Sequence, residues 1–492
     1  MRIVVAFTAS ALALFAAGCS TKSDAGGGAG ADAAAPGASL TYTPAGCSYK
    51  VSPPDSRGYV DLGLDDSRAR GSAPSRVRIG LGGGTASGSA GYADPTTTAV
   101  FTWETPDATL AAEVRLGTAP SAEGDVHTGY SWTTPAPTIG LGTTDPAPHM
   151  HEVHVCGLAA GRTYTYQVGG GSPEVWSAPQ SFTTVPASGK VILGVSGDAR
   201  DSADIFQMVQ LRMRDAAVSM QLFSGDAVLV GAQESLYGTF LDKAWKDPSD
   251  ATKFLTLGQQ MIVPVAGNHE NESAQFYGNF AIPGDGPNAE TYASFDVGNT
   301  HVVLLDDQSI AVMGSSDAAK EQLAWLERDL TRAETNRAKV PLILVLHHRG
   351  ELSTSEHARD SDVVATRAAL LPIWDKHHVD LVLTGHDHNY ERSKPVTGPA
   401  TSPQVQAAAS AGTTYVVCAG AGASGYVPGT APSPYREKNV GFGEGKPGSS
   451  YVGVYSLITL EGRTLTLNAY GLKASGKTVS GDDLIDTFQL TR

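Results

Sequence analysis

The sequence predicts an all-β sandwich followed by an α/β domain, in which two mixed β-sheets pack face to face with flanking helices. Two observations predict this order. From about residue 49 to residue 186, short runs of alternating apolar and polar residues are separated by Gly, Pro and Ser, which is typical of a sandwich. From residue 190 onward, apolar strand-like runs alternate with segments of helical periodicity and then give way to strands alone.

The first segment of the chain is typical of export. Arg2 precedes an apolar run over residues 3–17, which is the right length for a signal-peptide core and too short for a membrane span. Gly18-Cys19 resembles a bacterial lipobox, although Ala16 stands where leucine is usual, and an ordinary secretory signal is the alternative. We expect a signal peptide over residues 1–19, lipidation of Cys19, and an exported lipoprotein that contacts a membrane through this anchor only. Ser20 is compatible with the outer membrane, and the protein would face the periplasm or the cell exterior.

Composition constrains the part of the chain beyond the signal segment. Residues 20–46 are dominated by Ala, Gly, Ser and Asp, so we expect a flexible tether there. A formal net charge of -15 with no compensating basic run argues against a nucleic acid polymer or an anionic lipid surface as partner. An oxidising compartment permits a disulfide. Because Cys47 and Cys156 both fall in the N-terminal part, we expect them to pair, and we expect Cys418 to be a buried small hydrophobe.

The predicted domains are residues 47–187 and 188–492. Strands are expected in the first at 96–105, 111–118, 150–158, 162–170 and 179–186. In the second, helices are expected at 202–217 with Ser202 as N-cap, and at 231–245, 249–259, 318–334 and 363–378. A hairpin that turns at Gly298-Asn299 is expected over 291–307. The remaining strands are expected at 191–198, 220–226, 261–270, 341–348, 379–386, 414–420, 451–460, 463–471 and 484–490.

Polar side chains follow five of these apolar strands, at the point where each strand ends. They are Asp198, Asp226, Asn268, His347, His386 and His388. The carboxyl ends of strands in an α/β sheet meet at one edge, so residues spread along the sequence would come together there. Carboxylate, amide and imidazole groups are ligands for divalent and trivalent metals. The sequence therefore predicts a metal site at this edge.

The order of these motifs, GD, GD, GNHE, H and GHDH, resembles the calcineurin-like metallophosphoesterase superfamily. The segments VFTWE, EVRLGT, HEVHVCGLAAGRTYTYQVG and WSAPQSFTT resemble the fibronectin type III-like domain that precedes many purple acid phosphatases. The resemblance covers nearly all of the chain after about residue 49. It implies an acid phosphatase-like phosphomonoesterase that acts on small phosphate esters through a dinuclear metal site, where an activated water attacks phosphorus.

The resemblance also implies roles for single residues. Asp226 would bridge two metal ions, Asp198 and His388 would complete the first site, and Asn268, His347 and His386 would bind the second. His269 would orient the substrate or protonate the leaving alkoxide, and a purely structural role is its alternative. Glu270 would orient His269, and His348 would point away from the metals. His357 lies at a position loosely similar to a substrate-contacting histidine, and a surface-loop histidine is the alternative.

Two positions depart from the family pattern. Leu229 stands where purple enzymes have the tyrosine that binds ferric iron, and Arg200 stands where related enzymes have a histidine ligand. We therefore expect no purple tyrosinate–Fe(III) chromophore and a weaker first site, with the ions open among Fe, Zn, Mn, Mg and Ca. Arg200 would contact the substrate phosphate or pair with Asp201. The alternative functions are a phosphodiesterase or nucleotidase, and a non-catalytic surface-binding lipoprotein with a degraded first site.

Overall fold

The computed structural model describes residues 42–51, 59–83, 93–134, 147–284, 290–314, 316–399, 401–429, 432–443 and 450–492. The described residues form one compact unit. The expected signal peptide, the lipidation site Cys19 and the expected tether up to residue 41 lie outside the described residues. Within the described part of the chain, no helix is both long and apolar enough to cross a membrane.

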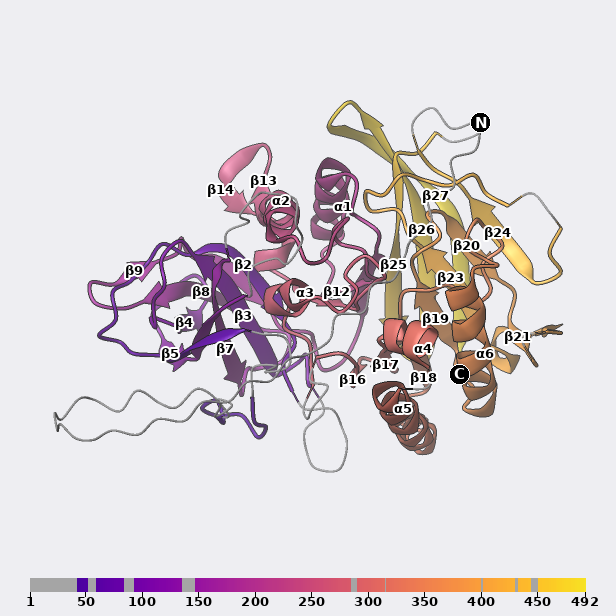
Figure 1. Ribbon diagram of the computed structural model, residues 1–492, viewed down its shortest axis with the longest axis horizontal. Helices are drawn as coiled ribbons and strands as arrows, with labels where there is room; N and C mark the ends of the chain where they lie inside the picture. Colours follow the sequence, from indigo (N-terminus) through magenta and orange to yellow (C-terminus); the bar gives the residue numbers. More distant parts are fainter. Residues whose placement is uncertain are drawn as a thin grey trace, which may run out of the picture. The chain divides into compact units, whose positions relative to one another are not determined.

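A β-sandwich forms the N-terminal region, as predicted (Figure 1). One sheet contains β10 (Gln180–Thr183), β8 (Thr163–Gly170), β4 (Glu113–Thr118) and β5 (Asp125–Thr128), with β9 (Val175–Trp176) paired to β8. The facing strands are β1 (Val60–Leu64), β6 (Tyr130–Thr133), β7 (His149–Cys156), β3 (Thr98–Thr105) and β2 (Ser75–Gly80). Phe101 packs between the sheets, with its ring centroid 4.6 Å from Tyr166 and 5.4 Å from Phe182. A disulfide joins Cys47 to Cys156 at the end of β7, which is the pairing expected from the sequence.

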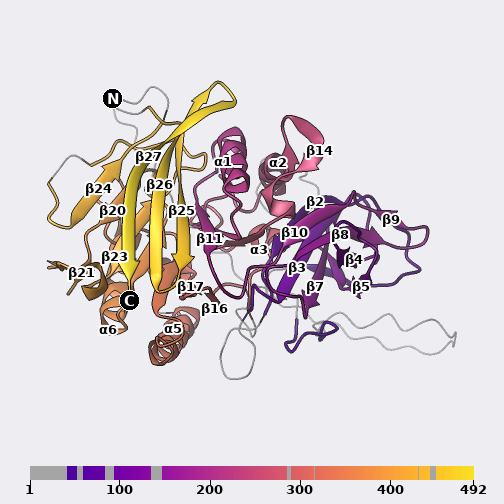
Figure 2. The ribbon, with the colours of Figure 1, turned by 180° about the vertical axis from the view of Figure 1, so that it is seen from behind.

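The second of these sheets continues into the α/β region. Its order runs from β2 through β15 (Met261–Pro264), β12 (Met220–Phe223), β11 (Val191–Ser196), β25 (Gly453–Glu461), β26 (Thr464–Ser475) and β27 (Thr478–Thr491), giving eleven strands. The junction is a parallel pairing of Ile79 with Met261. The two regions predicted as separate domains therefore share one sheet. The boundary expected after residue 187 falls in the connection between β10 and β11, two strands that Figure 2 labels.

A second sheet of seven strands completes the α/β region. Its order is β16 (Ala293–Val297), β17 (Thr300–Leu304), β18 (Leu342–Leu346), β19 (Leu381–Thr384), β23 (Thr414–Cys418), β20 (Tyr390–Ser393) and β24 (Arg436–Val440). The predicted hairpin between β16 and β17 turns at Gly298, whose φ of 57° favours glycine. Leu193 and Ile458 of the first sheet share a buried core with Leu344 of the second. The two mixed sheets thus pack face to face, as predicted.

Helices cover the outer faces of both sheets. They are α1 (Ala203–Asp215), α2 (Glu234–Trp245), α3 (Ala274–Asn279), α4 (Asp307–Met313), α5 (Asp317–Thr335) and α6 (Ser361–Lys376). Leu326 of α5 and Trp374 of α6 pack with Val345 in a second core outside the seven-stranded sheet. Helix α1 begins after Ser202, whose hydroxyl accepts a hydrogen bond from the Ile205 amide, as the sequence predicted.

The prediction of a helix over residues 249–259 is wrong. The chain instead forms a hairpin of β13 (Lys246–Asp247) and β14 (Asp250–Phe254), followed by a 3₁₀ turn over Thr256–Gly258. The Asp247 carboxylate accepts a hydrogen bond of 2.8 Å from the Ser249 amide, which fixes a turn where helical spacing alone suggested a helix. The remaining short elements are β21 (Val396–Thr397), β22 (Gln404–Val405) and a 3₁₀ turn over Ala409–Ala411.

A buried histidine in β17 should make stability depend on pH. His301 is 3% exposed, and its ring nitrogens lie 2.7 Å from Asp296 Oδ1 and 2.9 Å from Asp329 Oδ2. Burial disfavours the charged ring, but the two carboxylates outweigh burial and raise its pKa to about 9. The charged form therefore stabilises the fold fully below the ordinary pKa of about 6.5, and this contribution is lost as pH rises to about 9.

We expect the free energy of unfolding in urea to fall by up to about 3 kcal/mol between pH 6.5 and 9, beyond the contribution of other groups. A His301→Gln variant should lose this part of the slope. The control is His149→Gln, since half-buried His149 contacts only the Thr133 hydroxyl among the hydrogen bonds described. An unchanged slope in His301→Gln would show that the ring is not charged in the folded protein.

Candidate metal centre

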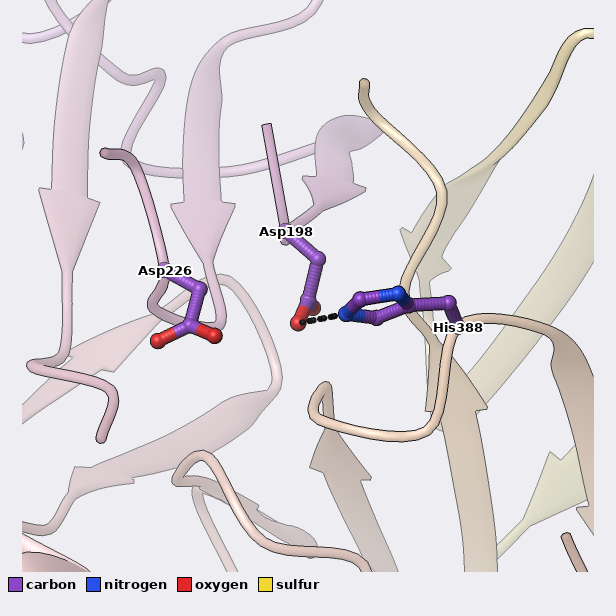
Figure 3. A group of neighbouring side chains, drawn as sticks. All are labelled: Asp198, Asp226 and His388. Carbon is purple, nitrogen blue, oxygen red and sulfur yellow. Dashed lines mark ion pairs between the residues drawn. The ribbon is translucent and has the colours of Figure 1, made fainter. Parts of the chain in front are cut away.

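Three buried ligand-type side chains converge where the first sheet meets the second. Asp198 follows β11, Asp226 follows β12, and His388 lies between β19 and β20. One ligand atom from each lies within 4.8 Å of the others, and His388 Nε2 is 3.5 Å from Asp198 Oδ1 (Figure 3). Burial raises the pKa of Asp198 well above its ordinary value, and the nearby Asp226 carboxylate adds to the rise. Two carboxylates buried this closely favour a bound cation.

A second group of donor atoms lies on the other side of Asp226. Asn268 Oδ1 is 2.9 Å from His348 Nε2 and 2.9 Å from His386 Nδ1. His348 Nε2 is also 3.4 Å from Asp226 Oδ1. Asp226 is therefore the residue that both groups share, which is the position that a bridging ligand requires.

The backbone at these strand ends is unusual. Asp198, Asp226 and His386 have φ values of 57°, 57° and 69°, in the left-handed region that non-glycine residues seldom adopt. Each such residue costs about 1–3 kcal/mol, and such strain gathers at functional sites. Neighbouring glycines permit the close approach, because a Cβ at Gly267 would lie 2.2 Å from Asp226 Oδ1 and one at Gly385 would lie 2.3 Å from Asp198 Oδ2.

The placement of the two adjacent histidines is the reverse of the prediction. His348, expected to point away, contacts Asn268 and Asp226, and its Nδ1 donates to the Ser224 carbonyl at 2.7 Å. His347, expected among the ligands, is fully buried behind the site, where its ring nitrogens lie 3.0 Å from Asp307 and 3.0 Å from Glu351. His348 therefore takes the place that the sequence pattern assigned to His347.

The reason for this reversal is Asp307, which was not among the residues predicted for the site. Its carboxylate accepts hydrogen bonds from the backbone amides of His348 and Arg349 and from the Arg349 guanidinium, and it also contacts His347 Nδ1. Although burial opposes ionisation, Arg349 and His347 hold the pKa of Asp307 well below its ordinary value. Asp307 thus fixes the loop after β18. A signal was present, because Asp307 also follows an apolar strand.

Glu270 has a different role from the one expected. Its carboxylate does not orient His269. It accepts hydrogen bonds of 2.8 Å from the backbone amides of Gly267, Asp226 and Ala227. Glu270 therefore holds the two loops that carry Asp226 and Asn268 against each other.

His269 is oriented by a backbone carbonyl. Its Nδ1–H donates to the Leu229 carbonyl at 2.7 Å, which leaves Nε2 facing the site, 3.9 Å from Asp226 Oδ2. Its side chain is 26% exposed, so a bound molecule can reach Nε2. This arrangement is compatible with the expected contact to a substrate.

Arg200 lies inside the site. Its Nη2 is 3.4 Å from His388 Nε2, its Nε is 3.8 Å from Asp226 Oδ2, and its Nη1 is 3.6 Å from Asp201 Oδ1. The pairing with Asp201, one of the two roles expected for this residue, is therefore present, though at long range. The additional contact with His388 was not expected.

His357 and Tyr426 cover the outer side of the centre. The His357 ring centroid lies 4.3 Å from that of His386, and the Tyr426 ring stacks on His388 at 4.2 Å. His357 Nδ1 contacts Asp360 at 2.7 Å, and its Nε2 contacts the Tyr426 hydroxyl at 3.1 Å. The structure therefore brings His357 to the site. Tyr426 follows no strand directly and offered no signal in the sequence.

The donor atoms are of the types that bind metal ions. Asp198, Asp226 and His388 offer two carboxylates and an imidazole, while Asp226, Asn268, His348 and His386 offer a carboxylate, an amide oxygen and two imidazoles. Oxygen and imidazole donors suit Mg, Mn, Fe or Zn rather than soft ions. Burial lowers the pKa of His388 to about 4, and the Arg200 charge adds to this effect, so the ring is neutral and Nε2 carries a lone pair.

Comparisons with known proteins point to the same family in both regions of the chain. Residues 88–184 match the model of the purple acid phosphatase N-terminal domain, and residues 149–390 match that of the calcineurin-like phosphoesterases. An uncharacterized protein of Mycobacterium tuberculosis is 24% identical over 330 residues, covering 61% of this chain and 60% of that protein. Purple acid phosphatase 18 of Arabidopsis thaliana is 25% identical over 320 residues, covering 61% and 65%. This chain therefore spans less than two thirds of these relatives.

The solved structures support the same fold. The purple acid phosphatase PPD1 from yellow lupin seeds superimposes with a TM-score of 0.64 at 17% identity, covering 86% of this chain and 75% of that chain. The structure of PhoD gives a TM-score of 0.58 at 12% identity, covering 85% and 91%. At such identities the likeness shows the fold alone.

Proposed function

We propose that the chain is a metal-dependent hydrolase of phosphate monoesters, because its residues 149–390 match the calcineurin-like phosphoesterases. The observation that carries the proposal is the position of Asp226, whose carboxylate lies between the Asp198–His388 pair and the group of Asn268, His348 and His386. Two divalent ions on such ligands lower the pKa of a water and draw charge from the phosphoryl oxygens.

The side chains around the centre support this chemistry. Water adds to phosphorus as the ester P–O bond breaks, so the leaving alkoxide needs a proton. His269 with a proton on both ring nitrogens is the proposed donor: Nδ1–H stays bonded to the Leu229 carbonyl, and the Nε2 proton, which faces the site near the Asp226 carboxylate, passes to the leaving oxygen. The site has limited exposure, because His386 and His388 are 7% and 1% exposed. A small phosphate ester fits this setting better than a polymer.

The test compares 4-nitrophenyl phosphate with bis(4-nitrophenyl) phosphate as substrates of the full chain. We expect the monoester to be hydrolysed faster than the diester. Monoester hydrolysis should be lost after chelation and should return when one of Mn²⁺, Zn²⁺, Mg²⁺, Ca²⁺ or Fe²⁺ is added. Faster hydrolysis of the diester would instead favour a phosphodiesterase or nucleotidase. A chain that binds metal but hydrolyses neither ester would favour the non-catalytic surface-binding alternative.

The N-terminal segment supports placing this activity outside the cytoplasm. The apolar run before Cys19 and the Ala- and Gly-rich residues after it are the features that motivate a lipid-anchored, exported protein. In a detergent phase separation, the full chain should partition into the detergent phase, and a Cys19→Ser variant should partition into the aqueous phase. Equal partitioning of both proteins would contradict lipidation at Cys19.

A further inference from the structure

The hydrogen bonds of His388 fix which of its ring nitrogens is available to a metal. Nδ1–H donates to the Ser424 carbonyl at 2.8 Å, so the lone pair lies on Nε2. Nε2 is also the atom that joins His388 to Asp198 and Asp226 in the three-residue cluster. A metal ion at this cluster therefore has to take the Nε2 lone pair.

The Arg200 guanidinium is directed at the same lone pair. Its Nη2 lies 3.4 Å from His388 Nε2, within reach of a long hydrogen bond in which the guanidinium donates. Its Nε lies 3.8 Å from Asp226 Oδ2 and is buried without a hydrogen-bond acceptor among the described residues. One lone pair cannot accept a hydrogen bond and bind a metal at once, so the two cations compete for His388.

The charge of Arg200 adds to this competition. The guanidinium is a cation, and this side chain is only 15% exposed, so water screens its charge weakly. A divalent ion bound to Asp226 and His388 would lie within a few ångströms of this positive charge. The repulsion weakens binding at this group of ligands.

Asn268, His348 and His386 have no direct contact of this kind with an arginine or lysine among the described residues. Burial, His348, His357 and, at longer range, Arg349 lower the pKa of His386. Arg349 follows His348 in the chain. Its guanidinium donates hydrogen bonds to the side chains of Asp307, Asp362 and Gln308. The two groups of ligands share Asp226, but among the described contacts only the first has an arginine within 3.4 Å of one of its imidazole nitrogens.

We propose that Arg200 competes with a divalent cation for His388 and Asp226, so that the two ions bind with unequal affinity and the Asp198–Asp226–His388 group fills last. Arg200 thus acts as the residue that sets how much metal the centre holds. The inference rests on the proposed function only in that both concern the same centre. It predicts an outcome that is unusual for a change inside an active centre, because removing the side chain should strengthen metal binding.

The experiment is calorimetric titration of the chelator-treated full chain with Mn²⁺, with the ions per chain counted by elemental analysis. The wild type should show two binding events whose dissociation constants differ by at least about tenfold, or a single event. Arg200→Met keeps much of the side-chain length without the charge. It should tighten the weaker event at least about tenfold, or restore a missing one, and change the tighter event much less, because only Asp226 is shared between the two groups.

Two further variants locate the effect. His388→Ala should remove the weaker event and keep the tighter one. Arg212→Met removes an Arg of α1 that pairs with Asp215 and Asp482, so it controls for net charge and should change neither event. Equal affinities in the wild type, weaker or unchanged binding in Arg200→Met, or loss of the tighter event in His388→Ala would each overturn the inference.

The readout is independent of hydrolysis. A chain that shows unequal binding but cleaves no phosphate ester would keep this inference and lose the proposed function. A chain that hydrolyses monoesters with two equal metal sites would do the opposite.

Discussion

An Asp226→Asn variant should lose phosphomonoester hydrolysis by about 10²- to 10³-fold in kcat/KM. The change keeps the size of the side chain and removes its negative charge. Among the described residues, Asp226 is the member shared by both groups of donor atoms: a ligand atom of its carboxylate lies within 4.8 Å of those of Asp198 and His388, and its Oδ1 is 3.4 Å from His348 Nε2. A neutral amide cannot bridge two divalent ions as a carboxylate does, so both ions should bind more weakly.

The measurements are kcat/KM for 4-nitrophenyl phosphate and the number of ions per chain. Asp317→Asn is the matched control, because this carboxylate is fully exposed in the first turn of α5. The control should keep wild-type activity and metal content. Retention of full activity and both ions in Asp226→Asn would contradict the assignment of a shared ligand. Thermal unfolding of the variant shows whether any loss reflects misfolding instead.

The positions of the strands and of most candidate ligands could be predicted because they are local properties of the sequence. An apolar run that ends in Gly-Asp or Gly-Asn marks both the strand and the polar residue beyond it, as at β11, β12 and β15. Sheet topology then brings Asp198, Asp226 and Asn268 to one edge. Prediction succeeds where the strand end itself positions the side chain.

The misplaced residues depend on contacts between distant parts of the chain. His347 and His348 both follow β18, and the periodicity of the strand does not decide which one faces the site. Asp307, which precedes them by about forty residues in the sequence, decides it through its hydrogen bonds to the loop. Glu270 was misjudged for the same reason, since its partners are backbone amides of another loop.

The shared sheet could not be predicted either. The pairing of β2 with β15 is a single parallel register contact, between Ile79 and Met261, and neither strand carries a residue type that signals it. The change from sandwich to α/β region could be predicted because it is a change in the local periodicity of apolar residues. Local periodicity does not indicate which strand edges pair.

Replacing His348 and His347 separately by alanine should give opposite outcomes. His348→Ala should lower kcat/KM by about 10²-fold or more and weaken binding of one ion, because Nε2 lies 2.9 Å from Asn268 Oδ1 and 3.4 Å from Asp226 Oδ1. His347→Ala should keep both ions. Its ring contacts no member of either donor group in the described hydrogen bonds.

The effect of His347→Ala should appear in stability instead. Although burial opposes it, Glu351 and Asp307 raise the pKa of His347 to about 9, so the ring is charged at neutral pH between two carboxylates that are fully buried. Removing one partner of a buried ion pair destabilises a protein by about 3–5 kcal/mol. We therefore expect a marked fall in the urea midpoint for His347→Ala and a smaller one for His348→Ala.

The decisive measurement is the number of Mn²⁺ ions bound by each folded variant, compared with kcat/KM. If His347→Ala loses an ion while His348→Ala keeps both, the assignment made from the sequence alone would be correct and the arrangement seen around Asp307 would not represent the metal-bound protein. If both variants lose the ion, the Asp307 network and the ligands act as one unit. A Trp374→Phe variant then tests whether the network alone affects metal binding, since Trp374 donates to Glu351 at 2.8 Å without touching a ligand.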